Sequence, residues 1–141
     1  MRTVHLVLLR ALGVAILLQF YFAGVGAFAA PRDDKSFAIH EVFGMAVIPL
    51  LILLAIGAAA LARQPGRVIG WTAVPLGLLV VQVLIVEIGK RIGGGTEDHT
   101  TTGGLIVLGL HAVNALVIMF AVGRAFTMAR AVEPATAAAS A

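Results

Sequence analysis

Two histidines lie inside stretches of the sequence that are otherwise apolar. His111 stands in "GLHAVNALVIMF" (residues 109–120), with Asn114 one helical turn later, and His40 stands in "IHEVFGM" (residues 39–45). A polar side chain in an apolar membrane segment is costly unless it has a partner or a ligand. Imidazole is a strong ligand of iron, and two imidazoles can fill both axial positions of a haem. The pair therefore indicates a haem b site with His40 and His111 as axial ligands.

The composition indicates the kind of chain that positions these histidines. It has 141 residues, of which 60% are apolar and 12% charged, and its mean hydropathy is +1.04. Such values are typical of polytopic membrane proteins and not of soluble domains. The absence of cysteine excludes disulfides, thiolate metal sites and cysteine nucleophiles. The net charge of +3 is spread over the loops, so it indicates membrane orientation and no nucleic-acid partner.

The apolar runs leave room for four spans of about 20 residues. Helices satisfy every backbone group in lipid, and the alternation typical of barrel strands is absent. The sequence therefore predicts an all-α fold: a single antiparallel bundle of four transmembrane helices, kinked at Pro49 and Pro75, with a disordered tail. We expect helices at about residues 5–30, 36–62, 68–90 and 103–128 in a domain of residues 1–130, followed by the tail at 131–141.

The basic residues predict the orientation of the bundle. Six of the ten lie near the termini or in the loop between the second and third spans, and the other loops hold four, accompanied by acidic residues. This bias predicts that both termini are cytoplasmic. "AFA" at residues 27–29 also resembles a signal-peptidase cleavage site, but the apolar run before it is long for a signal peptide.

The second and fourth spans run in the same direction and carry the histidines to similar depths. At about 1.5 Å per residue, His40 lies about 7 Å inward of Lys35, and His111 about 11 Å inward of Gly103. Both therefore fall in the outer half of the bundle. Small residues one turn later, Gly44 and Ala115, would leave room for the macrocycle. We expect the side-chain amides to hold the free imidazole N–H groups, and aromatic rings to line the haem edge. The amides are those of Asn114, Gln19 and Gln82, and the rings those of Phe22, Phe28, Phe37 and Phe43.

The same polar residues also fit a simpler hypothesis. His40, Glu41, Glu87, His111 and Asn114 would form a hydrogen-bonded cluster that fixes helix register. The protein would then be a non-enzymatic accessory or assembly subunit, or a binder of a small apolar ligand. Zinc or copper would need Glu41 or Glu87 as a third ligand, and Glu41 lies about 100° round the helix from His40.

The remaining ionisable residues have local interpretations. Glu87 precedes Lys90 and Arg91 by three and four residues, which predicts an ion pair at the helix end. The alternative is a proton or quinone site that includes Glu87, Glu41 and His99. We interpret His99 as a solvated loop residue or a cap over the site, and His5 as interfacial.

The motifs "LQFYFAGVGAF", "IHEVFGM", "RQPGRVIGW", "VVQVLI" and "GLHAVNALVIMF" resemble an uncharacterised family of small four-helix membrane proteins from actinobacteria. The layout is also similar to one four-helix half of haem A synthase and to membrane b-type cytochromes, which hold haem with histidines on paired helices. Haem A synthase has a glutamate and an arginine at the positions of Phe37 and Glu41, so the resemblance does not extend to its hydroxylating chemistry. It implies a bacterial cell membrane and haem bound by His40 and His111.

A haem with two histidine ligands has no open position for a substrate, so we expect single-electron transfer and not catalysis. One haem in the outer half of the bundle cannot carry electrons across about 30 Å of hydrocarbon. The expected partners are therefore a quinol, a partner cytochrome or a second copy of the chain in a homodimer.

Overall fold

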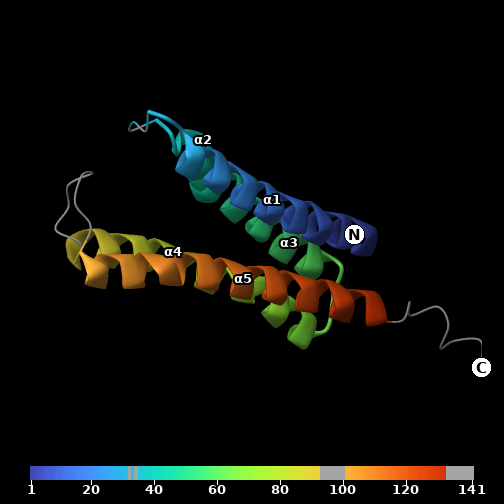
Figure 1. Ribbon diagram of the computed structural model, residues 1–141. Coiled ribbons are helices and arrows are strands. Elements are labelled where there is room, and N and C mark those ends of the chain that lie inside the picture. Colours follow the sequence, from blue (N-terminus) through green and yellow to red (C-terminus); the bar gives the residue numbers. More distant parts are fainter. Residues whose placement is uncertain (32, 34, 93–100, 133–141) are drawn as a thin grey trace, which may run out of the picture.

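The computed structural model describes residues 1–31, 33, 35–92 and 101–132, which are helical throughout apart from the turns and loops that join the helices (Figure 1). The elements are α1 (Arg2–Phe28), α2 (Ala38–Val42), the π-helical η1 (Phe43–Val47), α3 (Ile48–Leu61), α4 (Gly66–Ile92) and α5 (Thr102–Ala131). Because α2, η1 and α3 follow one another without a break, they form one span, Ala38–Leu61. With α1, α4 and α5 the structure has four helices long and apolar enough to cross a membrane. The all-α class and the four spans are confirmed.

The four spans form an antiparallel bundle. The helix α1 packs against α3 and α5, and α4 packs against the same two helices. The beginning of α1 and the end of α5 lie at one end of the bundle, together with the turn between α3 and α4 (Figure 1). Many large apolar side chains point outward, among them Leu61 at 72% exposure and Phe120 at 67%. A helical bundle that is apolar on its outside is that of a multi-pass membrane protein.

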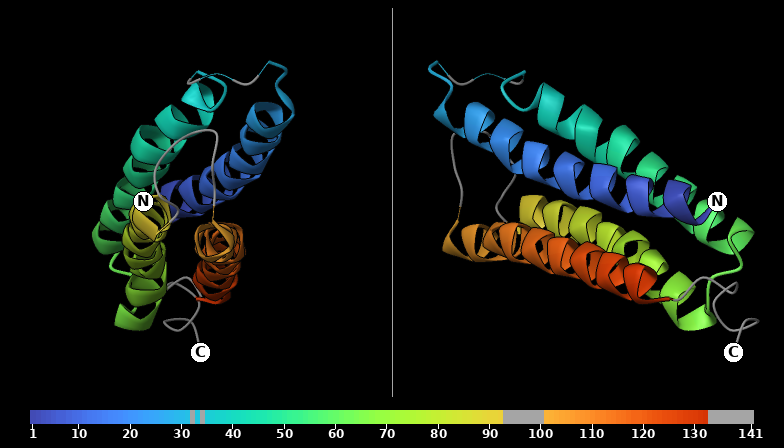
Figure 2. Two further views of the ribbon diagram at one scale, coloured as in Figure 1. Left: turned by 60° about the vertical axis from the view of Figure 1, so that its left-hand side comes forward. Right: turned by 90° about the vertical axis from the view of Figure 1, so that its right-hand side faces the viewer.

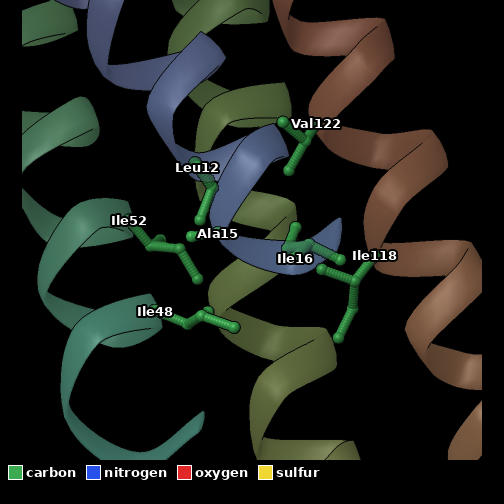
Figure 3. Packing of buried hydrophobic residues seen from close by; sticks show 7 residues of the cluster. All are labelled: Leu12, Ala15, Ile16, Ile48, Ile52, Ile118 and Val122. Atoms are coloured by element: carbon green, nitrogen blue, oxygen red, sulfur yellow. The ribbon is translucent and has the colours of Figure 1, made fainter. Parts of the chain in front are cut away.

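The core consists of aliphatic side chains at the centre of the bundle and smaller ones toward the termini. The central cluster joins α1, α3 and α5 (Figure 3). Its members are Leu12, Ala15, Ile16, Ile48, Ile52, Ile118 and Val122. Nearer the termini, Ala55, Ala125 and Ala129 are fully buried beside Leu9 and Val68. Alanine at these positions lets the helix backbones approach closely, which is how membrane helices gain packing energy.

The two helical hairpins, α1 with α2–α3 and α4 with α5, diverge away from the termini (Figures 1 and 2). No Cα atom of α2 or η1 lies within 8 Å of one in α4 or α5. The bundle is therefore closed at the end with the termini and more open at the end that holds α2.

The π-helical segment η1 explains how the second span accommodates Pro49. Proline lacks an N–H group, and its ring would clash with the carbonyl of the residue four positions earlier. The chain widens before the proline, and the Ile48 N–H donates to the carbonyl of Phe43, five residues back. In α4 the helix continues through the buried Pro75. The predicted kink at Pro49 is therefore a π turn, which begins three residues after His40.

The helix bounds lie close to the predicted ones. The largest differences are at the ends of α1 and α5, which begin at Arg2 and end at Ala131. Of the tail that the sequence predicts to be disordered, residues 133–141 lie outside the described part of the chain.

The helix α3 ends in a Schellman motif, in which the Gln64 N–H donates to the carbonyl of Ala59 and the Arg63 N–H to that of Ala60. Arg63 occupies the left-handed position with φ 50°, where a side chain costs about 1–2 kcal/mol relative to glycine.

We therefore expect Arg63→Gly to stabilise the protein by about 0.5–1 kcal/mol, since part of the gain is offset by the greater freedom of glycine in the unfolded chain. The measurement is thermal unfolding in mild detergent. Arg63→Ala removes the same charge but keeps a Cβ atom, so it serves as the control. Equal stability of the two variants would show that the left-handed position carries no strain.

Candidate functional site

The structure brings His40 and His111 together across the divergent end of the bundle. Their ring centroids are 6.0 Å apart and the ring planes are inclined at 54°. His40 belongs to α2, in the first hairpin, and His111 to α5, in the second. Both residues are half-buried. Two residues far apart in the sequence thus present their imidazoles to each other from different hairpins.

Hydrogen bonds to Gln19 hold His40 in a defined orientation. The Nδ1 atom of His40 lies 3.2 Å from the backbone carbonyl of Gln19. Because a carbonyl only accepts, Nδ1 carries the hydrogen, and Nε2 keeps its lone pair. The side-chain amide of Gln19 in turn donates to the His40 carbonyl at 2.8 Å. This reciprocal pair leaves His40 Nε2 as a nitrogen that can bind a metal.

His111 has the corresponding glutamine in its own hairpin. The amide of Gln82 on α4 donates to the His111 carbonyl at 2.8 Å. The Nδ1 atom of His111 is buried and has no hydrogen-bond partner among the described residues. A buried nitrogen without a partner costs about 1–3 kcal/mol. His111 is therefore less firmly held than His40 and has a polar atom that a ligand or water would satisfy.

The two glutamine–histidine pairs form an internal repeat. Each hairpin supplies a glutamine from its first helix and a histidine from its second, and the glutamine amide reaches the histidine carbonyl in both. The sequence carries a faint trace of this repeat. The two glutamines end the stretches "LLQ" and "VVQ", and the two histidines lie in "IHEV" and "LHAV". These matches are too short to predict a repeat, and its presence follows from the contacts.

Asn114 and Gln82 join α4 to α5 below His111. The Asn114 amide donates to the carbonyl of Leu78 at 2.9 Å, and it makes a second hydrogen bond to the side-chain oxygen of Gln82. The side-chain amides were predicted to hold the imidazole nitrogens. Among the described residues they donate to backbone carbonyls and to a neighbouring amide oxygen instead. The histidine that is oriented by hydrogen bonding, His40, is held by a backbone carbonyl.

The small residues after the histidines are placed differently from each other. A Cβ atom on Gly44 would lie 2.7 Å from the Gln19 amide nitrogen, so Gly44 provides the space through which Gln19 reaches the next helix. Ala115 is half-buried. That either residue faces a macrocycle stays a prediction.

The aromatic residues divide into those near the histidines and one that points away. The ring of Phe37 lies 6.3 Å from that of His40, and Phe22 packs edge-on against Phe43 at 5.2 Å. Phe28 is 90% exposed and points away from the bundle. Phe37 is thus the aromatic ring beside the histidine pair.

The carboxylates lie apart from the histidines. Glu41 and Glu87 are exposed, and in the described part of the chain no ion pair joins Glu87 to Lys90 or Arg91, so the predicted ion pair is not formed. The same part of the chain contains no group of three histidine or acidic side chains that could hold a metal ion. His99 lies outside the described residues.

His5, which the sequence places alone near Arg2 and Arg10, is fully buried against other helices. Its Nε2 atom lies 3.1 Å from the Thr72 hydroxyl, and that hydroxyl donates to the Val68 carbonyl at 2.9 Å. His5 Nε2 is therefore the donor to Thr72. The spacing of His5, Leu9 and Leu12 along one helical face was the available signal, since both leucines are buried too. This bond ties α1 to α4 at the closed end of the bundle.

Comparison with protein families gives one match, to a family of unknown function, DUF6220, over residues 19–89. The matched stretch is half of the chain. The protein belongs to this family. The match includes Gln19, His40 and Gln82 and ends before His111. Comparisons with curated proteins and with solved structures gave no match.

The contact between Gly44 and Gln19 can be tested by substitution. In Gly44→Ala the new methyl group displaces the Gln19 amide from the His40 carbonyl, whereas a Cβ on Gly57, in the same span, meets nothing within 4 Å. Both variants gain helix propensity, so Gly57→Ala is the matched control. We expect Gly44→Ala to be less stable than Gly57→Ala by about 1 kcal/mol, measured by thermal unfolding in detergent. Equal stability would mean that the Gln19–His40 bond contributes nothing.

Proposed function

We propose that the protein binds one haem b between His40 and His111 and transfers single electrons. The observation that supports this proposal is the 6.0 Å separation of the two rings, contributed by different hairpins. Metal–imidazole bonds of about 2 Å on both sides of an ion separate the ring centres by about 6 Å. The distance in the structure is therefore close to what two axial ligands require.

The surroundings of the pair also suit a planar cofactor. The histidines lie at the end where α2 and η1 have no close backbone contact with α4 or α5. Haem is flat and largely apolar, so it fits between helices and needs few polar contacts. The free Nε2 of His40 and the unpartnered Nδ1 of His111 show that each ring has a nitrogen without a protein partner.

The number of ligands favours haem over a bare metal ion. Zinc sites use three or four protein ligands, and no group of three suitable side chains exists among the described residues. Haem brings four nitrogens of its own, so two histidines complete the coordination.

The residues of the chain would hold the group in different ways. His40, fixed by the Gln19 carbonyl, and His111, on the helix joined to α4 by Gln82 and Asn114, would be the axial ligands. A haem held on both faces in this way supplies one-electron chemistry and has no open position for substrate. In this respect the proposed site is similar to those of membrane b-type cytochromes.

The proposal includes the cellular setting. We place the bundle in a bacterial cell membrane with both termini in the cytoplasm, on the distribution of the arginines. The site then lies in the outer half, and a quinol, a partner cytochrome or a second copy of the chain would exchange electrons with it. Glu87 and Glu41 are exposed acidic residues at that end of the bundle and are the candidates for proton exchange with a quinol.

A second candidate function is favoured by the hydrogen bonds themselves. The pairs Gln19–His40, Gln82–His111 and Gln82–Asn114 already join neighbouring helices without a cofactor. In this alternative the polar residues fix helix register in a non-enzymatic accessory subunit or a binder of a small apolar ligand.

Visible spectra distinguish the two functions. The protein is expressed with haem available, purified in mild detergent, and recorded oxidised and after dithionite reduction. We expect a sharp reduced α-band and a low-spin Soret band, and the loss of both in His40→Ala and in His111→Ala, because each ligand is needed for the six-coordinate state. His5→Ala removes a buried histidine at the other end and should keep the spectrum. A folded but colourless wild-type protein would rule out the haem function and leave the structural one.

A further inference from the structure

Three arginines converge at the end of the bundle where the termini lie. The guanidinium carbon of Arg10, on α1, lies 5.2 Å from the centre of the Phe126 ring. That of Arg130, on α5, lies 5.7 Å from the same ring. Arg2 donates a hydrogen bond from Nη2 to the Arg130 carbonyl at 3.1 Å. We call Arg2, Arg10 and Arg130 the terminal arginine cluster.

The cluster has no acidic partner in the described part of the chain. The described carboxylates, Asp33, Glu41 and Glu87, belong to the opposite end of the bundle, and none forms an ion pair with these arginines. The Arg2 Nε atom is buried and has no hydrogen-bond partner among the described residues. Arg10 and Arg130 thus share one aromatic ring, and Arg2 contacts the backbone of Arg130, with no described carboxylate to neutralise the three charges.

The surroundings provide both space and order for an anion. A shallow hollow of about 310 Å³ adjoins the cluster and is lined by Thr127, Arg130 and Ala131. The ring of Phe126 attracts both guanidinium groups by cation–π interaction, which offsets part of their mutual repulsion and limits their motion. An anion placed there would meet the guanidinium group of Arg130.

We propose that the terminal arginine cluster binds the phosphate group of an anionic phospholipid. Guanidinium groups bind phosphate oxygens through paired N–H donors. The cluster lies where the apolar spans end, which is the level of lipid headgroups. Exposed apolar side chains extend from it along the helices, among them Val7 and Val14 on α1, and acyl chains can pack against them. Inorganic phosphate has no acyl chain and would gain only the polar part of the interaction.

Native mass spectrometry of the full chain in neutral detergent tests the proposal. Phosphatidylglycerol or phosphatidylcholine is added at matched concentrations, and the fraction of lipid-bound protein is measured. We expect preferential binding of phosphatidylglycerol, and about 25-fold weaker binding in Arg10→Gln/Arg130→Gln, since each arginine near a membrane surface contributes about five-fold to anionic lipid affinity. The control, Lys90→Gln/Arg91→Gln, removes the same charge at the opposite end and should change the affinity less than two-fold.

A third variant separates the cluster from net charge. Phe126→Ala keeps every arginine but removes the ring that holds two of them, so we expect several-fold weaker phosphatidylglycerol binding. Helix content by circular dichroism verifies that each variant is folded. Equal loss in the two charge variants, or unchanged binding in Phe126→Ala, would overturn the proposal. The proposal would also be overturned if millimolar inorganic phosphate displaced bound phosphatidylglycerol as effectively as added phosphatidylglycerol does. The site would then recognise a free anion.

Discussion

The bundle depends on one constraint: inside an apolar span, every polar group must find its partner within the protein. The side-chain N–H groups of Gln19 and Gln82 meet it by donating to the backbone carbonyls of His40 and His111. Each bond joins the two helices of one hairpin and fixes their register. The imidazole rings then lie on the side of each hairpin that faces the other one, which is why two residues so distant in sequence have their ring centres 6.0 Å apart.

The two ends of the bundle are packed differently. At the end with the termini, buried alanines such as Ala125 and Ala129 and the His5–Thr72 bond hold all four spans together. At the other end α2 and η1 stay apart from α4 and α5. The closed end holds the four spans together, so the other end keeps its backbones apart and is joined there by the side chains of the two histidines. A binding site between the hairpins needs both properties, since packing that closed the second end would bring the helices too near for a cofactor.

The fold could be predicted from the sequence because lengths of apolar runs and the positions of charges and prolines determine where spans begin and end. The proximity of His40 and His111 also followed from their depths along parallel helices. The hydrogen-bond partners of the side-chain amides could not be predicted. Sequence spacing shows which face of a helix a side chain lies on, but not which atom of the neighbouring helix it contacts. The burial of His5 was not predicted for the same reason: its partner is Thr72, a residue of another helix. The π turn before Pro49 accommodates the ring and the missing N–H group of the proline, and a hydropathy pattern does not record such a change in hydrogen bonding.

The family match covers only part of the site. The match covers Gln19, His40 and Gln82, so it contains one complete glutamine–histidine pair and the glutamine of the other. The second histidine comes from α5, beyond the match, and it is also the less firmly held, since its Nδ1 atom has no described partner. One firmly held histidine and one less firmly held histidine suit a site that must admit a flat cofactor before both ligands bind it. The proposed haem site therefore depends most on His111, and α5 is the element that decides whether the paired-histidine arrangement becomes a cofactor site or remains a helix–helix contact.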